Sequence, residues 1–327
     1  IQGKIKKQDF EPNAPYTITA TVIGNYKYVK FQEQPYYCSQ NINKLTPKPI
    51  ISKWNKKIAY FFVANVQKFV SLYNGQQGGY KLDDIKKHVI LLPTHNGAID
   101  FAFMETFIAE LEAQSIAELE AYLTITGLKD YTLTEEEEKV LNSLDKVQWK
   151  EYNLNDLYGN ATRGKRLKSA DRITGKLPFV TAGEADTGIS DFIGNKVTIF
   201  SENTTTIDMF GSAKYRNYSY GGDDHIAVVH TEKVPKYAAI FVTSAIHKVS
   251  YAGQFSYSRN FYAKDADELN IFLPTKNGTP DYDFMNTYIS AIHKVVIKEV
   301  VLYAEKKIQQ QQQKHIYYLT VSVPQES

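Results

Sequence analysis

The stretch LPTHNGAIDFAFMETFIAEL at residues 92–111 returns later in the chain as LPTKNGTPDYDFMNTYISAI at residues 273–292. Within this window, ten positions are identical at a constant separation of 181 residues. The matches mix proline, glycine, acidic, aromatic and aliphatic residues, so a biased composition does not explain them. The chain therefore contains two copies of one structural unit.

The repeat extends upstream with a slightly different separation. IGNYKY at residues 23–28 matches FGSAKY at residues 210–215, and the first residue of the sequence matches Ile189 in the second copy. Residues 147–188 have no counterpart in the first copy. We therefore expect the first domain to lack its amino-terminal part.

Length and composition indicate a globular protein. A chain of 327 residues is long enough for two domains with separate cores. The sequence is 43% hydrophobic, and no apolar run approaches the roughly 20 residues that cross a bilayer. The single cysteine, Cys38, excludes an internal disulfide and is typical of a reducing cytoplasm, where we expect it to be a buried thiol.

Short apolar runs precede each copy of the repeat. IAYFFVANV from Ile58 and AAIFVTSAI from Ala238 favour buried strands, as does the β-branched segment VTIF from Val197. HVILLP and LNIFLP are expected to be the last strands of the two units, because each is ended by a proline that cannot donate a ladder hydrogen bond.

A glycine-containing turn and a long helical pattern follow each LPT motif. Apolar residues recur there at spacings of three and four, which places them on one helix face. Two helices with matched stripes can pack against each other to form a spacer about 38 Å long, although each helix could instead pack on its own domain. The stripes comprise Met104, Ile108, Leu111, Leu119 and Tyr122 in the first helix and Met285, Ile289, Ile292, Val296, Val300 and Tyr303 in the second.

The segment between the two units carries helix-boundary signals. Gly127 can end the first long helix, and Thr134 with Glu137 forms a capping box that predicts a short helix over about residues 135–144. After Ile308 come five glutamines and a short β-prone tail, to which we assign no function.

No residue pattern indicates an active site. The histidines lack metal-ligand spacing and the lone cysteine offers no thiolate cluster, so we expect no metal site. GNATRGKR at residues 159–166 has the spacing of a phosphate-binding loop, but Arg166 stands where a hydroxyl should ligate magnesium. Asp281 could belong to a nuclease carboxylate pair with Glu299, but its position favours a helix cap.

Nucleic-acid binding is favoured by local rather than net charge. The formal net charge is only +2, but residues 163–176 hold six basic residues against one acid. Such separation permits one basic face, although a solvated lysine-rich loop explains the run as well. The loops at residues 211–225 and 252–261 combine bases, amides and tyrosines, which can contact phosphates and base edges if they are not half-buried strand and turn residues.

The candidate DNA-contacting residues are drawn from these loops and their first-unit counterparts. They are Lys27, Lys30, Gln76, Gln77 and Lys81 in the first unit, Lys165, Arg166, Lys168 and Arg172 as phosphate contacts, and Lys214, Arg216, Asn217, Gln254, Tyr257, Ser258 and Arg259 in the second unit.

Together these features resemble the specificity subunits of Type I restriction-modification systems, including the related subunits of BcgI-like systems. The resemblance rests on the two LPT-x-NG helix starts, on WKEYNLNDLYG from Trp149 and on GKRLKSADRITGKLPFVTAGE from Gly164. It covers nearly the whole chain except the tail.

The resemblance implies an α/β (α+β) fold with two target-recognition domains of mixed, mainly antiparallel strands with short helices, separated by two long antiparallel coiled-coil-like helices. Each domain would read one half of a bipartite DNA target. The expected segments are a first recognition domain (residues 1–94), a central spacer (95–146), a second recognition domain (147–275), a distal spacer helix (276–308) and a Gln-rich tail (309–327).

The resemblance also implies partners. Such subunits have no catalytic activity; in the prokaryotic cytoplasm they bind double-stranded DNA, modification (methyltransferase) subunits and a restriction (nuclease-translocase) subunit. No cofactor is expected on this chain, and S-adenosylmethionine is expected on the methyltransferase partner. Two alternatives remain: the recognition half of a single-chain restriction-methylation enzyme, and a helical interaction protein that does not bind DNA.

Overall fold

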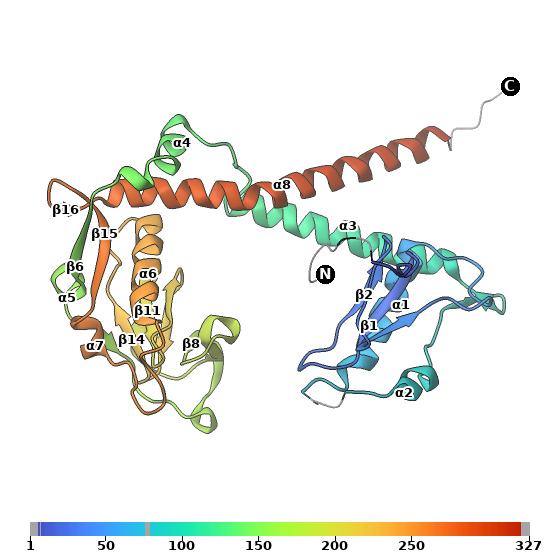
Figure 1. The fold of residues 1–327 in the computed structure, drawn as a ribbon, viewed down its shortest axis with the longest axis horizontal. Helices are drawn as coiled ribbons and strands as arrows, with labels where there is room; N and C mark the ends of the chain where they lie inside the picture. Colours follow the sequence, from blue (N-terminus) through green and yellow to red (C-terminus); the bar gives the residue numbers. More distant parts are fainter. Residues whose placement is uncertain (1–5, 7, 76–78, 322–327) are drawn as a thin grey trace. The chain divides into compact units, whose positions relative to one another are not determined.

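A computed structural model describes residues 6, 8–75 and 79–321 (Figure 1). The chain divides into two compact units, of which unit 1 comprises residues 1–122 and 304–327 and unit 2 comprises residues 123–303. No helix within the described residues is long and apolar enough to cross a membrane.

Unit 1 is built on a three-stranded antiparallel sheet in the order β2-β1-β3. A core of apolar side chains from β1 and β2 packs against α1, and residues from the segments around α2 complete it. Its elements are β1 (Thr17–Thr21), β2 (Val29–Gln32), β3 (Ile42–Leu45), α1 (Lys56–Ser71), α2 (Leu82–Lys87), β4 (Thr94–His95), β5 (Ala98–Ile99) and the greater part of α3 (Phe101–Ile125).

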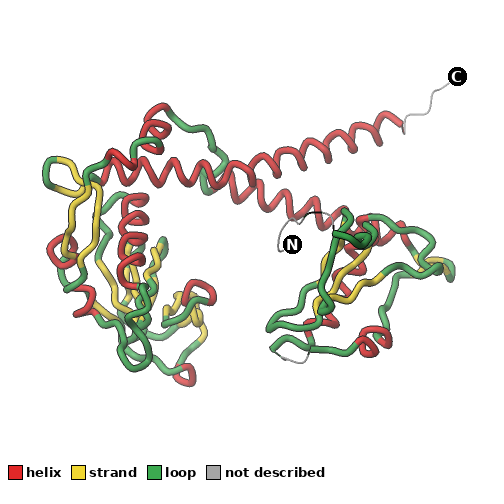
Figure 2. The backbone as a smooth tube through the Cα atoms, viewed as in Figure 1, coloured by secondary structure: helices red, strands yellow, loops and turns green. Residues whose placement is uncertain are grey.

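Unit 2 contains two four-stranded sheets, in the orders β12-β11-β14-β7 and β10-β13-β8-β9, and the smaller sheet β16-β15-β6 (Figure 2). Pairing is antiparallel except between β13 and β8. The elements are α4 (Glu135–Leu141), β6 (Trp149–Asn153), α5 (Leu154–Tyr158), β7 (Thr162–Arg163), β8 (Thr174–Val180), β9 (Ile189–Ile193), β10 (Ile199–Phe200), β11 (Thr204–Asp208), β12 (Ala213–Arg216), β13 (Tyr220–Gly222), β14 (Ile226–Val229), α6 (Lys236–Ser250), α7 (Ala263–Asp267), β15 (Asn270–Lys276), β16 (Thr279–Pro280) and α8 (Tyr282–Val321), together with short 3-10 turns at Leu144–Lys146, Ser169–Asp171 and Ala185–Gly188.

The sequence repeat is a structural repeat. The order β12-β11-β14 in unit 2 repeats the order β2-β1-β3 in unit 1. In each unit a helix then packs on these strands, α1 on β2 and α6 on β12, and a short helix and a two-stranded turn lead into a long helix. Strands β6 to β10 and β13 belong to unit 2 alone among the described residues. The mixed, mainly antiparallel fold class predicted from sequence is confirmed.

The two apolar runs expected to be strands are helices, so that prediction is wrong. The run from Ile58 lies in α1, whose first turn is capped by the Asn55 side chain, which accepts a hydrogen bond of 3.1 Å from the Ile58 amide. The run from Ala238 lies in α6. The helices that contain these runs have 16 and 15 residues, or about four turns each, and their apolar residues face a sheet on one side only.

The two runs that end in proline differ in secondary structure between the two units. LNIFLP forms β15, which continues through Pro274 to Lys276. HVILLP, at residues 88–93, has no strand assignment, so the prediction of a strand there is wrong. The prediction from Val197 is confirmed only for Ile199 and Phe200. Cys38 is exposed and not buried as expected.

The starts of the two long helices are capped as the repeat predicts. Asp100 accepts a hydrogen bond of 2.8 Å from the Phe103 amide, and Asp281 accepts one of 3.0 Å from the Phe284 amide. The helix α3 ends before Gly127, whose φ of +69° is a left-handed conformation that terminates helices.

Burial along the long helices matches the predicted stripe only near their starts. Met104 and Ile108 in α3 and Met285 in α8 are buried. Further along, Leu111 is 44% exposed and Val296 is 70% exposed. The helix α8 also continues to Val321, so the tail expected to be β-prone is helical up to that residue, and residues 322–327 lie outside the described residues; glutamine and lysine are favourable helix formers.

The capping box predicted at Thr134 also anchors α4 to α8 within unit 2 (Figure 1). Glu137 is buried and accepts hydrogen bonds from Ser290 (2.7 Å) and Lys294 (2.9 Å). Burial alone would raise the pKa of the Glu137 carboxyl, but the backbone hydrogen bond from Thr134 and the bonds from Lys294 and Ser290 outweigh it. They lower that pKa to about 2.

Replacing Glu137 by Gln is expected to reduce the free energy of unfolding of unit 2 by about 2 kcal/mol at pH 7. Because the folded-state pKa of Glu137 is depressed, its contribution is fully present above about pH 4.5 and is lost as pH falls toward 2. Urea unfolding at pH 7 and pH 3 should therefore show the difference from wild type shrinking by roughly half. The exposed neighbour Glu136→Gln is the control; a pH-independent difference would contradict the assignment.

Candidate nucleic-acid interface

Residues 163–176 of unit 2, the basic segment, run from β7 into β8 and are held in place at both ends. The strand β7 pairs with β14, with Arg163 opposite Ala227. At Gly164 the chain passes so close to β13 that a Cβ would lie 1.6 Å from the Gly222 carbonyl oxygen, so only glycine fits. Beyond this contact, Lys165, Arg166 and Lys168 are exposed.

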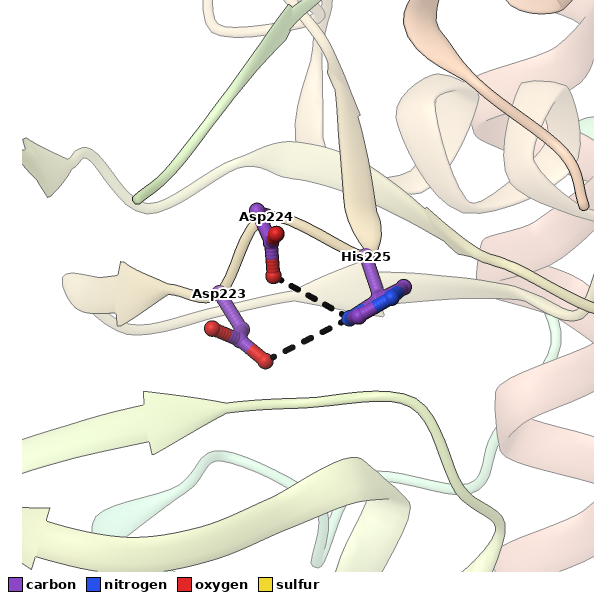
Figure 3. Close-up of side chains that lie close together, drawn as sticks. All are labelled: Asp223, Asp224 and His225. Carbon is purple, nitrogen blue, oxygen red and sulfur yellow. Dashed lines mark ion pairs between the residues drawn. The ribbon is translucent and has the colours of Figure 1, made fainter. Parts of the chain in front are cut away.

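Asp223, the first of three consecutive polar residues after β13, holds this loop. The Asp223 carboxylate accepts a hydrogen bond of 3.2 Å from the Leu167 amide. Figure 3 shows His225 turned toward both neighbours, with its Nδ1 3.7 Å from Asp223 and 3.1 Å from Asp224. The three side chains lie close enough together for metal ligation, but Asp223 already serves the loop. Asp223 therefore positions the basic segment, and His225 pairs with both acids.

Arg172 is placed differently from the other basic residues of this segment. Its side chain is 13% exposed and lies 5.1 Å from the centroid of the Phe179 ring. It donates to Ser190 (3.2 Å) and lies 3.8 Å from the Asp191 carboxylate. Arg172 therefore ties the loop to β9, and only part of its guanidinium can reach a ligand.

The loop around β12 contains one buried and two more accessible candidates. Arg216 is 1% exposed and donates to the Thr206 hydroxyl (2.9 Å), the Thr187 carbonyl (2.8 Å) and the Tyr218 hydroxyl (3.0 Å). The prediction that Arg216 contacts DNA is therefore wrong, because its donors are used inside the unit.

Lys214 and Asn217 flank this buried arginine. Lys214 is 15% exposed and lies 3.2 Å from Glu184 and 3.7 Å from Asp208. The hydrogen bonds from Ser212 and Lys214 hold the pKa of the Glu184 carboxyl below its usual range, which favours its ionised form beside Lys214. Asn217 is exposed.

The loop at residues 252–261 projects an aromatic and a basic side chain. Tyr257 is 84% exposed and contacts Phe210 edge-on at 5.1 Å between ring centroids. Arg259, with a side chain 53% exposed, lies 5.2 Å from the centroid of the Phe255 ring and forms an ion pair with Asp265. Its hydrogen bond to Asp265 raises the pKa of the Arg259 guanidinium.

The remaining candidates in this loop have local partners. Ser258 forms a 2.9 Å hydroxyl contact with Ser256. Gln254 donates to the Val249 carbonyl (2.8 Å) and accepts from the Ala252 amide (2.9 Å), so its amide orders the loop. Backbone hydrogen bonds between Ser256 and Arg259 close the turn that presents Tyr257.

In unit 1 the structure separates the predicted candidates. Lys27 is 1% exposed and donates to the Gly24 (2.9 Å) and Tyr73 (2.5 Å) carbonyls, so its predicted contact with DNA is wrong. Lys30 and Lys81 are exposed. Gln76 and Gln77 lie outside the described residues.

Sequence reasoning missed two exposed apolar side chains beside the basic segment of unit 2. Ile173 is 62% exposed and Phe192 is 52% exposed, and the Ile173 carbonyl accepts a 2.7 Å hydrogen bond from Gly194, two residues after Phe192. The sequence carries no signal for either exposure, because nothing in a short segment marks which side chain meets solvent.

Comparisons with known proteins place these features in a family. Residues 1–121 and 146–302 match the Type I restriction modification DNA specificity domain. The specificity subunit S.BcgI of a Type II restriction enzyme from Heyndrickxia coagulans is 26% identical over 287 residues, which are 84% of this chain and 77% of that protein.

A solved structure has the same fold. The Type I restriction-modification S subunit from M. genitalium superposes with a TM-score of 0.52 at 17% identity, covering 98% of this chain and 86% of the other. The matched family model, over two repeated units, therefore places the chain in the class of DNA specificity proteins. The chain belongs to the Type I restriction-modification DNA specificity family and is a specificity subunit of a restriction-modification system.

Proposed function

We propose that each unit reads one half of a bipartite DNA target and that the chain itself carries no catalytic residue. The observation that supports this proposal is the structural repeat, in which β1, β2, β3 and α1 recur as β11, β12, β14 and α6 while the loops differ. A shared scaffold with different loops fits two readers of two different half-sites.

Within unit 2 we assign different tasks to the two exposed loops. Lys165, Arg166 and Lys168 contact phosphates, since they are flexible bases on a fastened loop. Tyr257 and Arg259 contact base edges, because the ion pair with Asp265 and the contact with Phe255 hold the guanidinium in one orientation. Lys30 and Lys81 are the corresponding phosphate contacts proposed in unit 1.

The partners in this proposal are double-stranded DNA, methyltransferase subunits and a nuclease-translocase subunit, in the cytoplasm of a prokaryote. S-adenosylmethionine would be bound by the methyltransferase subunit and not by this chain. For docking that subunit we favour the part of the predicted stripes that is exposed on the long helices. Those of the predicted stripe that are at least 39% exposed are Leu111, Tyr122, Val296, Val300 and Tyr303.

Selection of duplexes from a randomised library tests the proposal. The chain would be co-expressed with its methyltransferase subunit, and the bound DNA would be sequenced. A split motif with a fixed gap is expected if two units read two half-sites. No enrichment of any motif would contradict DNA recognition, and enrichment of one contiguous motif would contradict reading by unit 1.

Replacing Arg259 by Ala is expected to relax one base position of the selected motif and to leave the other positions unchanged, because a base-edge contact from arginine contributes about 1–3 kcal/mol of discrimination. Arg166→Ala, at one of the proposed phosphate contacts, is the control and should weaken all sequences alike. Thermal unfolding of the Arg259 variant checks that loss of the Asp265 ion pair leaves unit 2 folded. Uniform weakening by Arg259→Ala would make it a phosphate contact.

A further inference from the structure

The two exposed apolar side chains of this site, Ile173 and Phe192, lie on one face of the sheet that contains β8 and β9. Phe192 pairs with Pro178, and the next residue, Ile193, is buried. Side chains alternate along a strand, so Phe192 and Gly194 face the side opposite to Ile193. The Ile173 Cγ2 atom lies 3.8 Å from where a Cβ of Gly194 would be. Ile173 and Phe192, the apolar pair, are therefore diagonal neighbours on this face.

The backbone that carries the apolar pair is held in place. The Asn195 side chain accepts a 2.7 Å hydrogen bond from the Ile173 amide and donates one of 3.0 Å to the Asp171 carbonyl. At Gly175 the two segments pass so close together that a Cβ would lie 2.3 Å from the Gly194 amide nitrogen. The strand β9 is also the last strand of its sheet, in the order β10-β13-β8-β9. Both side chains are therefore presented from a fixed edge, which favours precise contact with a ligand.

Basic residues are in excess around the apolar pair. Residues 163–196, which contain both side chains, include seven basic and four acidic residues. Lys176 and Lys196 are exposed and follow the two apolar residues by three and four positions. Among the acids, Asp191 lies 3.8 Å from the Arg172 guanidinium, which offsets its charge. The surroundings of the apolar pair are therefore positively charged and complement a polyanion.

DNA fits this surface better than a protein partner does. Specific protein interfaces bury about 800 Å² on each partner, far more than two side chains offer. Among the described residues of this sheet, the other exposed large apolar side chain, Ile199, lies on β10 at the opposite edge. Proteins that bend DNA, in contrast, insert single apolar side chains such as phenylalanine or isoleucine between base pairs from the minor groove, with basic residues around them.

We propose that Phe192, supported by Ile173, inserts from the minor groove between two base pairs of the half-site that unit 2 reads and kinks the DNA there. This inference rests on the proposed function, because it requires unit 2 to bind DNA. Lys176 and Lys196 contact the phosphates on either side of the kink. Pyrimidine–purine steps unstack most easily, so Phe192 makes unit 2 favour such a step at a position that no polar side chain reads.

Selection from a randomised duplex library tests the inference when variant chains are compared in complex with the methyltransferase subunit. The wild-type complex is expected to enrich a pyrimidine–purine step at one fixed position in or beside the half-site of unit 2, which Arg259→Ala identifies. Phe192→Ala should keep the other positions of the motif and reduce the preference for that step by about fivefold. Ile199→Ala removes an equally exposed apolar side chain from the same sheet and should change nothing.

Energy transfer between dyes at the two ends of a selected duplex measures the kink independently. Phe192→Ala is expected to reduce the bend of the bound duplex by about 20° or more, and Ile199→Ala to leave it unchanged. A mismatch placed at the favoured step makes unstacking easier, so it should strengthen binding of the wild-type complex by about fivefold. It should not strengthen binding of the Phe192→Ala complex, because that chain has no side chain to insert.

A split motif with the same step preference and the same bend in wild type and Phe192→Ala would overturn the inference and leave the proposed function intact. No motif from the wild-type complex would instead contradict the proposed function, and the inference with it. Loss of the methyltransferase subunit from the purified Phe192→Ala complex would also overturn the inference, by making the apolar pair a protein contact. Ile173→Ala is the second variant and should reduce the bend in the same direction.

Discussion

Replacing Arg216 by Met is expected to lower the free energy of unfolding of unit 2 by about 2–4 kcal/mol, because the guanidinium is 1% exposed and its hydrogen bonds have no substitute in a thioether. The Thr187 carbonyl and the Tyr218 hydroxyl would lose a charged donor. Thermal unfolding of the full chain measures the loss, and the exposed neighbour Asn217→Ala is the control.

The same substitution should loosen the turn before β9. Asp186 and Thr187 have φ angles of +46° and +55°, which are unfavourable for residues with a side chain and especially for a β-branched one. The Arg216 guanidinium holds this turn through the Thr187 carbonyl. Hydrogen exchange across residues 185–189 should therefore accelerate in Arg216→Met and not in Asn217→Ala. A stable variant that has lost discrimination at one base would show that Arg216 reads DNA after all.

Arg216 also shows why the site was harder to predict than the fold. In the sequence, Lys27 and Arg216 are basic residues near glycine, asparagine and tyrosine, as surface readers often are. Their burial depends on carbonyl groups that are distant in sequence, at Tyr73 for Lys27 and at Thr187 for Arg216. Loop composition carries no information about such pairings.

The sequence was sufficient to predict features that depend only on neighbouring residues, such as helix caps. The caps at Asp100, Asp281 and Thr134 and the left-handed Gly127 follow from residues within one turn, and the structure confirms each. The repeat established the two-unit organisation because it compares the chain with itself.

Apolar runs were less informative because burial on a sheet does not fix the secondary structure. The run from Ile58 becomes a helix whose apolar face covers β1 and β2. HVILLP contains four apolar residues, one polar residue and a final proline, as its counterpart LNIFLP does, but only the latter has β6 beside it. Strand formation at such a run depends on a partner that the run itself does not encode.

The second large effect is expected on DNA affinity when the basic segment is changed. Replacing Lys165, Arg166 and Lys168 together by Ala should weaken binding of the complex to all duplexes alike, target or not, because phosphate contacts carry no sequence information. With about 0.9 counterions released per contact, the slope of log affinity against log salt should fall in magnitude by about 2.7. The folding of unit 2 should be unaffected, since all three side chains are exposed.

The measurement is a salt titration of affinity for the target duplex and for an unrelated duplex, from low to physiological salt. A matched triple variant, Lys139→Ala, Lys146→Ala and Lys236→Ala, removes the same charge from exposed positions outside the basic segment. An equal change of slope in the two triple variants would show that the effect depends only on the net charge of the chain. A change of sequence preference in the first triple variant would instead show that these residues contact base edges and not phosphates. Only base contacts distinguish one sequence from another.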